Sequence, residues 1–176
     1  AEGVISAVEM LRAIGDDYYP DFTGMDIVVV GGGNVAMDVA RSAIRCHAKS
    51  VKVAYRRRKQ DMTALAEEVE GAIADGVEIV ELNAPVRIEK DAQNRCTGLI
   101  VKPQIPGAVK GGRPSPKNSA KDEVLLPADR VLVAIGQGIE SGKFGEFGIP
   151  VQQGRISAFD TSDIADNEGI FAGGDC

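Results

Sequence analysis

Three consecutive glycines and the three residues after them have the spacing of a phosphate-binding turn. They are Gly31, Gly32, Gly33, Asn34, Val35 and Ala36, which form the pattern Gly31-x-Gly33-x-x-Ala36. In such a turn Gly31 permits the tight bend, Gly33 has no Cβ to hold a pyrophosphate away from the backbone, and Ala36 lets the helix pack closely on the strand. The amides and the positive end of the helix then face the phosphates. We therefore predict that this turn binds a pyrophosphate.

Four basic residues follow about 20 residues after the glycine turn, which is where a dinucleotide-binding fold usually places the side chain that contacts the adenosine ribose. They are Arg56, Arg57, Arg58 and Lys59, and Arg56 stands 20 residues after Ala36. An acid at this place binds the ribose 2′-OH of NAD, whereas an arginine accommodates the 2′-phosphate of NADP. We predict that Arg56 and Arg57 bind the 2′-phosphate of NADP(H), while Arg58 and Lys59 only add to the positive electrostatic potential around it. The alternative is a solvated basic turn.

These motifs need a strand, a turn and a helix to position them, and the hydrophobic pattern predicts all three. The run of β-branched residues from Ile27 to Val30 is typical of a buried parallel strand. From Asn34 the apolar residues change to the three-and-four spacing of a helix. The same reasoning predicts a second strand at 50–55, a helix at 64–75 and a third strand at 77–82.

The remaining chain is expected to contain antiparallel strands, one more parallel strand and an N-terminal helix. Residues 85–126 read as an inserted β-meander, with a surface loop at 103–121 to which we assign no chemistry. A helix is predicted at 3–14. The apolar segment 130–137 predicts a strand that ends in glycine. Because ligands bind at the carboxyl ends of parallel strands, we expect the residues at its end to approach the cofactor: Ala134, Ile135 and Gly136.

A last strand is expected at 170–172, running into Gly173, Gly174 and Asp175. This is a second place for close backbone approach to a ligand, and the Asp175 carboxylate can accept hydrogen bonds from hydroxyl groups. The predicted fold class is α/β, a Rossmann-like three-layer NAD(P)-binding domain with a parallel central sheet and the inserted meander.

Composition argues against several other functions. The formal charge of −6 and the pI near 4.9 disfavour a nucleic-acid binder. No apolar run approaches the roughly 18–20 residues that cross a bilayer. Cys46, Cys96 and Cys176 are far apart and the chain has one histidine, His47, which disfavours a dithiol site or a metal centre. We expect Cys46 to be a packing residue, His47 a surface or capping residue, and the protein to be cytoplasmic.

Five segments in this order resemble a known family. They are VVVGGGNVAMDVARSAIR, VKVAYRRR, ALAEEVEGAIADGVEI, ADRVLVAIGQ and the final TSD-x5-GIFAGGDC. They are similar to the NADPH-binding domain of the glutamate synthase small (β) subunit-like flavoproteins, within the pyridine nucleotide-disulfide oxidoreductase superfamily. The resemblance implies that 31–36 hold the pyrophosphate, Arg56 and Arg57 the 2′-phosphate, and 134–136 the strand end beside the nucleotide. It also implies that Asp175, with Gly174, contacts FAD in the full-length protein.

The resemblance further implies a division of the chain and a reaction. Residues 1–23 are expected to flank the domain, 24–138 to bind NADP, and 139–176 to lead back into an FAD domain, so that the chain is a fragment that catalyses nothing alone. In the parent, hydride would pass from NADPH to FAD, and electrons would move on to iron–sulfur centres outside this chain and to a large catalytic subunit. No catalytic residue is predicted here.

Three alternatives are weighed against this interpretation. One is a non-catalytic NAD(P)-sensing module, which needs no trailing FAD motif such as the segment from Thr161 to Asp175. Another is a thioredoxin-reductase-like flavoprotein, which would need a dithiol that is absent. An S-adenosylmethionine methyltransferase would carry an acid after the second strand, where this chain has Arg56.

Overall fold

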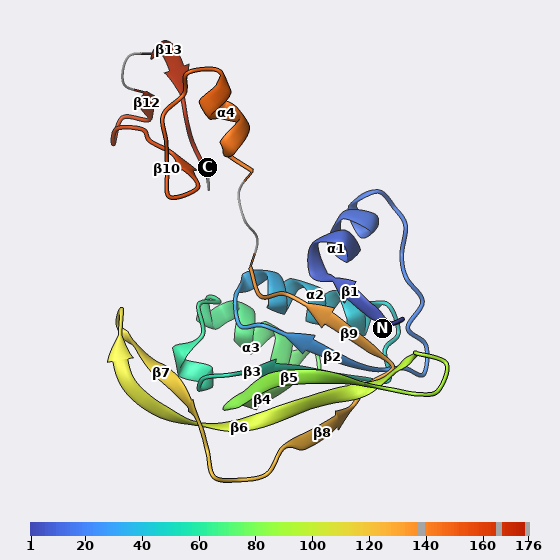
Figure 1. Ribbon diagram of the computed structural model, residues 1–176. Helices are drawn as coiled ribbons and strands as arrows, with labels where there is room; N and C mark the ends of the chain where they lie inside the picture. Colours follow the sequence, from blue (N-terminus) through green and yellow to red (C-terminus); the bar gives the residue numbers. More distant parts are fainter. Residues whose placement is uncertain (137–139, 165–166, 175–176) are drawn as a thin grey trace. The chain divides into compact units, whose positions relative to one another are not determined.

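The computed structural model describes residues 1–136, 140–164 and 167–174, and the chain divides into two compact units, residues 1–135 and 136–176. The first unit is built on a five-stranded sheet in which every pairing is parallel (Figure 1). In spatial order its strands are β1 (Val4–Ser6), β9 (Arg130–Val133), β2 (Asp26–Val30), β3 (Ser50–Tyr55) and β4 (Glu78–Glu81).

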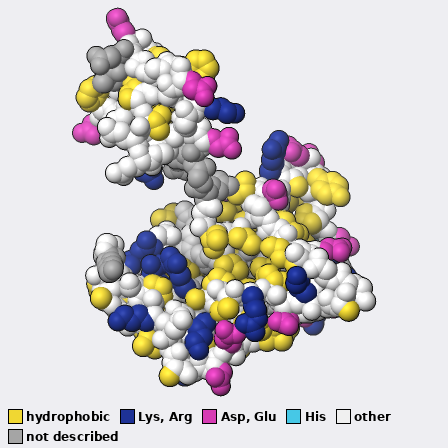
Figure 2. All heavy atoms as spheres, viewed as in Figure 1, with side chains coloured by type: hydrophobic (Ala, Val, Ile, Leu, Met, Phe, Trp, Pro, Cys, Tyr) yellow, Lys and Arg dark blue, Asp and Glu magenta, His cyan; other side chains and the backbone are white. Residues whose placement is uncertain are grey.

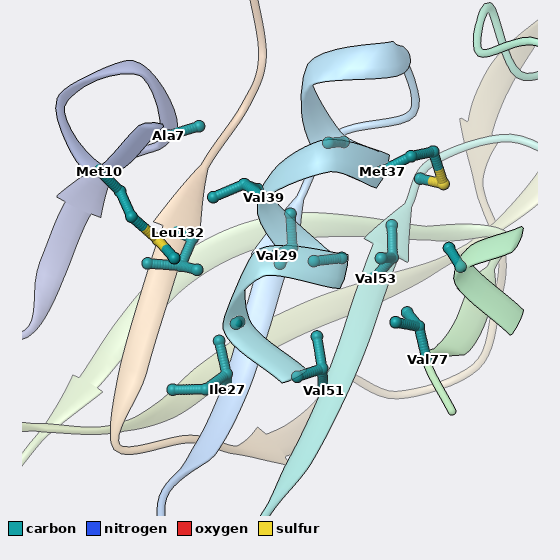
Figure 3. Close-up of a cluster of buried hydrophobic side chains, with 14 of the residues drawn as sticks. Ala7, Met10, Ile27, Val29, Met37, Val39, Val51, Val53, Val77 and Leu132 are labelled. Atoms are coloured by element: carbon teal, nitrogen blue, oxygen red, sulfur yellow. The ribbon is translucent and has the colours of Figure 1, made fainter. Parts of the chain in front are cut away.

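Helices cover one face of this sheet. They are α1 (Ala7–Gly15), α2 (Asn34–Arg45) and α3 (Ala66–Ala74). Figure 3 shows α2 lying over the strands, with Met37 and Val39 above side chains of β2 and β3 such as Val29 and Val53. The buried alanines of α2, including Ala36 and Ala40, bring the helix close to the sheet because they add little bulk.

An antiparallel sheet covers the other face. Its strands are β5 (Asn83–Lys90), β6 (Cys96–Lys110), β7 (Arg113–Asn118) and β8 (Val124–Pro127). Successive residues of β2 point to opposite faces, so Val29 belongs to the core under the helices and Val28 to the core under this second sheet. Helices, parallel sheet and meander form three layers, which confirms the predicted fold class.

The prediction of a surface loop at 103–121 was wrong. β6 continues to Lys110, and β7 returns alongside it from Arg113 to Asn118. The prolines after Pro103 are tolerated because β6 from Gln104 onward pairs with β7, and β7 is an edge strand that needs no amide on its outer side. Pro103 is the last residue of β6 that pairs with β5. The register also shifts between Pro106 and Val109, where a bulge relaxes the ladder.

The predicted N-terminal helix begins later than expected. Residues 4–6 form β1, which pairs in parallel with β9 in the register Val4 to Val131, and α1 starts at Ala7. The apolar spacing of this segment fits both structures, and an edge of the sheet was available to pair with it. The predicted parallel strand at 130–137 is shorter, since β9 ends at Val133.

The end of α2 confirms the roles expected for two residues. Cys46 is buried and packs in the core under the helices. His47 is exposed with a φ of 67°, and its amide donates to the carbonyl of Ile44, so it closes the helix.

The second unit is small. It contains α4 (Gly142–Glu146), a hairpin of β10 (Val151–Gln152) and β11 (Arg155–Ile156), and the pair β12 (Asp163–Ile164) and β13 (Asn167–Phe171). β13 overlaps the strand predicted at 170–172. Among the helices of the described residues, none has the length and apolar character needed to cross a membrane.

Candidate nucleotide-binding site

The carboxyl ends of three parallel strands meet at the glycine turn. β2 and β3 pair in the register Val30 to Ala54, and the Gly31 amide donates to the Ala54 carbonyl across 3.3 Å. On the other side of β2, the Ala134 amide donates to the Val30 carbonyl at 2.8 Å. The residues that follow β2 and β3 therefore lie at one edge of the sheet, on neighbouring strands.

At two of the three glycine positions, packing within the protein leaves no room for a Cβ atom. Gly31 has a φ of 150°, and a Cβ there would stand 2.4 Å from the Ala134 carbonyl oxygen. A Cβ on Gly32 would stand 2.3 Å from Cε2 of the Tyr55 ring. Gly33 is different, because the nearest atom to its Cβ would be the Thr63 hydroxyl oxygen at an ordinary 3.5 Å. No packing within the described residues explains a glycine at position 33.

The beginning of α2 offers unbonded amides. Gly33 is the N-cap and has no side chain to cap the helix, and the first turn contains no acidic residue. In the part of the chain that the structure describes, the amides of Gly32 and Gly33 donate no hydrogen bond. Val35 is 42% exposed in the first turn, while Ala36 is fully buried and serves the packing of helix on strand. Such a helix start attracts anions.

The loop that leads into α3 packs against the glycine turn. The amides of Thr63 and Ala64 both donate to the Gly32 carbonyl, at 3.0 and 3.1 Å. The Leu65 amide donates to the side-chain oxygen of Asn34 at 2.9 Å. The Asn34 side chain, predicted to contact the pyrophosphate, thus holds this loop in place.

Arg58 is part of the scaffold of the basic turn. Its guanidinium donates to both oxygens of Asp61, at 2.8 and 2.9 Å, and Asp61 is only 8% exposed. These hydrogen bonds hold the pKa of Asp61 below its ordinary value. The Asp61 carbonyl also accepts a hydrogen bond of 2.9 Å from the Tyr55 hydroxyl, so the short 3-10 helix η1 (Lys59–Asp61) is tied back to β3.

Arg56 and Arg57 have different surroundings. The Nε of Arg57 donates to the Pro114 carbonyl at 2.9 Å, and the side chain is half-buried. Arg56 is exposed, and among the described residues its guanidinium makes no hydrogen bond or ion pair. Figure 2 shows dark blue Lys and Arg side chains gathered on the side of the first unit where β7 and the turn after β3 lie.

The other predicted residues divide between the two units. Ala134 adjoins Gly31, and Ile135 is 72% exposed at the end of the first unit. Gly136 and Gly174 belong to the second unit and have φ values of 107° and 75°. Asp175 lies outside the described residues.

Three residues that shape this edge were missed by sequence reasoning. Tyr55 fills the space beside Gly32, Thr63 bonds to the Gly32 carbonyl, and Pro114 binds Arg57 through its backbone. The contact of Tyr55 could have been predicted from the sequence, since an aromatic residue directly before the basic run must pack near the glycine turn. Pro114 gave none, because its contribution is a carbonyl group.

Curated proteins similar to this chain carry names of NADP-dependent enzymes. The beta subunit of the NADP(+)-dependent formate dehydrogenase of Moorella thermoacetica is 37% identical over 174 residues, which cover 98% of this chain and 24% of that protein. The glutamate synthase [NADPH] small chain of Escherichia coli K12 is 32% identical, over 99% of this chain and 40% of that protein. The chain thus spans well under half the length of these relatives.

Solved structures share the fold at low sequence identity. Thioredoxin reductase of T. acidophilum superposes with a TM-score of 0.72 at 18% identity, over 99% of this chain and 49% of that chain. FprA of Mycobacterium tuberculosis, solved in complex with NADPH, gives a TM-score of 0.66 at 18% identity, over 93% of this chain and 50% of that one.

The family comparison covers nearly the whole sequence. The family model described as pyridine nucleotide-disulphide oxidoreductase matches residues 2–176. This agrees with the expected oxidoreductase class and with the expected cofactors of that family, a pyridine nucleotide and FAD. The chain belongs to the pyridine nucleotide-disulphide oxidoreductase family.

Proposed function

We propose that this chain is the NADPH-binding domain of an FAD-dependent oxidoreductase and presents NADPH for hydride transfer to the flavin. The observation that carries the proposal is the register of β2 and β3, Val30 to Ala54. It brings the turn at 31–36 and the exposed side chain of Arg56 to one edge of the sheet. The turn suits a pyrophosphate and the guanidinium suits an additional phosphate.

The residues at this edge fit the nucleotide chemically. The amides of Gly32 and Gly33, which donate to no acceptor in the described part of the chain, suit the pyrophosphate charge together with the positive end of α2. The open space at Gly33 lets the phosphates approach the backbone. Arg56 can pair with the 2′-phosphate through two parallel N–H groups. Bound NADPH supplies the hydride, so the role of this chain is to bind and orient the nucleotide.

The printed names of the relatives support NADP(H) and a place in a larger protein. They include NADP(+)-dependent formate dehydrogenase subunit beta, glutamate synthase [NADPH] small chain and NADPH-Fe(3+) oxidoreductase subunit beta. We extend the proposal accordingly: residues 24–138 bind NADP, 139–176 connect to an FAD domain, and electrons pass to iron–sulfur centres outside this chain and to a partner subunit of the glutamate synthase type.

A dithiol mechanism of the thioredoxin reductase type has no support among the described cysteines. Cys46 packs in the core under the helices, and Cys96 packs in the core under the antiparallel sheet. The parallel sheet lies between these two cores. The two thiols therefore cannot act as a pair.

Calorimetric titration with NADPH and with NADH tests the proposal. We expect tighter binding of NADPH, and we expect Arg56→Gln to raise the Kd for NADPH by about tenfold, since hydrogen bonds to charged groups contribute ~1.5–3 kcal/mol. Arg12→Gln, at an exposed arginine of α1, removes the same charge as a control. If neither nucleotide binds, or if Arg56→Gln behaves like Arg12→Gln, the proposal is wrong.

A further inference from the structure

The hairpin formed by the outer part of β6 and by β7, residues Gln104–Asn118, contributes nothing to either hydrophobic core. No residue between 105 and 117 belongs to the core clusters of the described chain. Its apolar side chains Ile105 and Val109 are 50% and 67% exposed. The layer that covers the parallel sheet is made by β5, the first part of β6 and β8. The hairpin therefore has no evident part in folding the domain.

The hairpin instead reaches the basic turn. The Pro114 carbonyl accepts the hydrogen bond from the Nε of Arg57 at 2.9 Å. A shallow crevice lies between the two segments. It is lined on one side by Arg56, Arg57, Asp61 and Leu82, and on the other by Ile105, Pro106, Pro114 and Pro116. Three prolines around one arginine make a stiff wall, since each has a restricted backbone.

The contact leaves part of Arg57 available. Only its Nε is engaged, and within the described residues its two terminal nitrogens make no hydrogen bond or ion pair. The guanidinium of Arg58 donates to both carboxylate oxygens of Asp61, so it is not available to bind a ligand phosphate. A guanidinium held at Nε has fewer rotamers to lose when its remaining N–H groups bind a ligand.

We propose that the hairpin 104–118 is the element that makes this site selective for a 2′-phosphorylated nucleotide. Pro114 acts as a positioning residue, since its carbonyl aims the terminal nitrogens of Arg57 at the phosphate that Arg56 also contacts. This inference rests on the proposed function. It means that the preference for NADPH over NADH depends on a segment that is remote in sequence from the glycine turn.

A truncated protein tests the inference. Residues 105–117 are replaced by Asn-Gly, a pair that favours a two-residue hairpin turn between Gln104 and Asn118, which already face each other. The pairing of β6 with β5 through Pro103 and with β8 is retained. We expect the Kd for NADPH to rise about tenfold and that for NADH to rise less, because the truncation weakens the 2′-phosphate contact. The truncation also removes three basic residues, Lys110, Arg113 and Lys117, whose loss affects both nucleotides, so a second variant is needed to assign the effect to Arg57.

Arg57→Lys provides a second measurement that keeps the charge and removes the Nε donor. In the intact protein we expect it to weaken NADPH binding selectively, and in the truncated protein we expect it to change little, because the contact with Pro114 is already gone. A residue that only supports the fold would not show this coupling between Arg57 and the hairpin.

The outcomes separate this inference from the proposed function. If the intact protein prefers NADPH and the truncated protein keeps that preference, the hairpin inference alone is wrong. Equal losses for NADPH and NADH on truncation also overturn it. If the intact protein binds neither nucleotide, the proposed function fails and this inference fails with it.

Discussion

The ring of Tyr55 packs against the backbone of Gly32 so closely that a Cβ on Gly32 would stand 2.3 Å from ring atom Cε2. The ring has little room to retreat, since Tyr55 is 7% exposed and its hydroxyl donates to the Asp61 carbonyl. The glycine turn after β2 and the basic turn after β3 are thus joined through one aromatic side chain.

Replacing Gly32 with alanine should therefore destabilise the fold. The added methyl group has to displace the Tyr55 ring, and overpacking of this kind typically costs about 1–3 kcal/mol. We expect the free energy of unfolding, measured by urea denaturation, to fall by that amount. A variant as stable as the unchanged protein would contradict the packing described for this turn.

Gly33→Ala is the matched comparison, and it should separate binding from stability. Position 33 has an ordinary φ of −102° and only a normal contact at 3.5 Å. The entropy gain from replacing glycine opposes the cost of alanine at an N-cap, so the unfolding free energy should change by less than about 1 kcal/mol. Binding of NADPH and NADH should weaken together, because both carry the pyrophosphate. Undiminished binding in calorimetry would show that the phosphates do not pass over Gly33.

The ion pair of Arg58 with Asp61 predicts a pH dependence. The hydrogen bond from Arg58 lowers the pKa of Asp61 below its ordinary value of 3.8. The unfolded chain therefore binds this proton more readily than the folded one. The stabilisation is present above about pH 4 and is lost as the pH falls through the lowered pKa.

Arg58→Gln should consequently lower the unfolding free energy at pH 7, and the difference from the unchanged protein should shrink at pH 3. Urea denaturation at both values measures it. A constant difference between pH 7 and pH 3 would argue against the ion pair as the cause.

Asp26, at the start of β2, offers a test at the opposite edge of the sheet. Its carboxylate accepts hydrogen bonds from the Ser50 hydroxyl at 2.6 Å and from Lys49 at 3.0 Å, and these lower its pKa. We expect Asp26→Ala to reduce the unfolding free energy by about 1 kcal/mol. Nucleotide affinity should not change, and a large loss of affinity would mean that the site depends on the whole sheet.

The two described cysteines should react slowly in the folded protein. Cys46 and Cys96 are each 6% exposed, and burial raises the pKa of both thiols, so less thiolate is present. We expect alkylation of both thiols by iodoacetamide, followed by peptide mass spectrometry at about pH 8, to be much slower in the folded protein than in concentrated urea. Rapid labelling of either in the native state would disprove this.

The local sequence pattern was sufficient to predict the strand, glycine turn and helix at 27–45 and the strand that ends before Arg56. These elements follow from the spacing of apolar residues and from the backbone freedom of glycine, which act over a few residues. It failed at 103–121, where proline content suggested a loop. Whether proline is tolerated in a strand depends on which side of the strand has a partner, and only the folded arrangement decides that.

The sequence by itself also determined that arginines follow β3, and it identified the family through its motifs. The tertiary structure decided what each arginine does: Arg58 binds Asp61, Arg57 binds Pro114, and Arg56 has no hydrogen-bond partner among the described residues. A guanidinium is bound by whichever acceptor the fold brings within reach. For Arg57 that acceptor is a carbonyl 57 residues away along the chain, which no local pattern encodes.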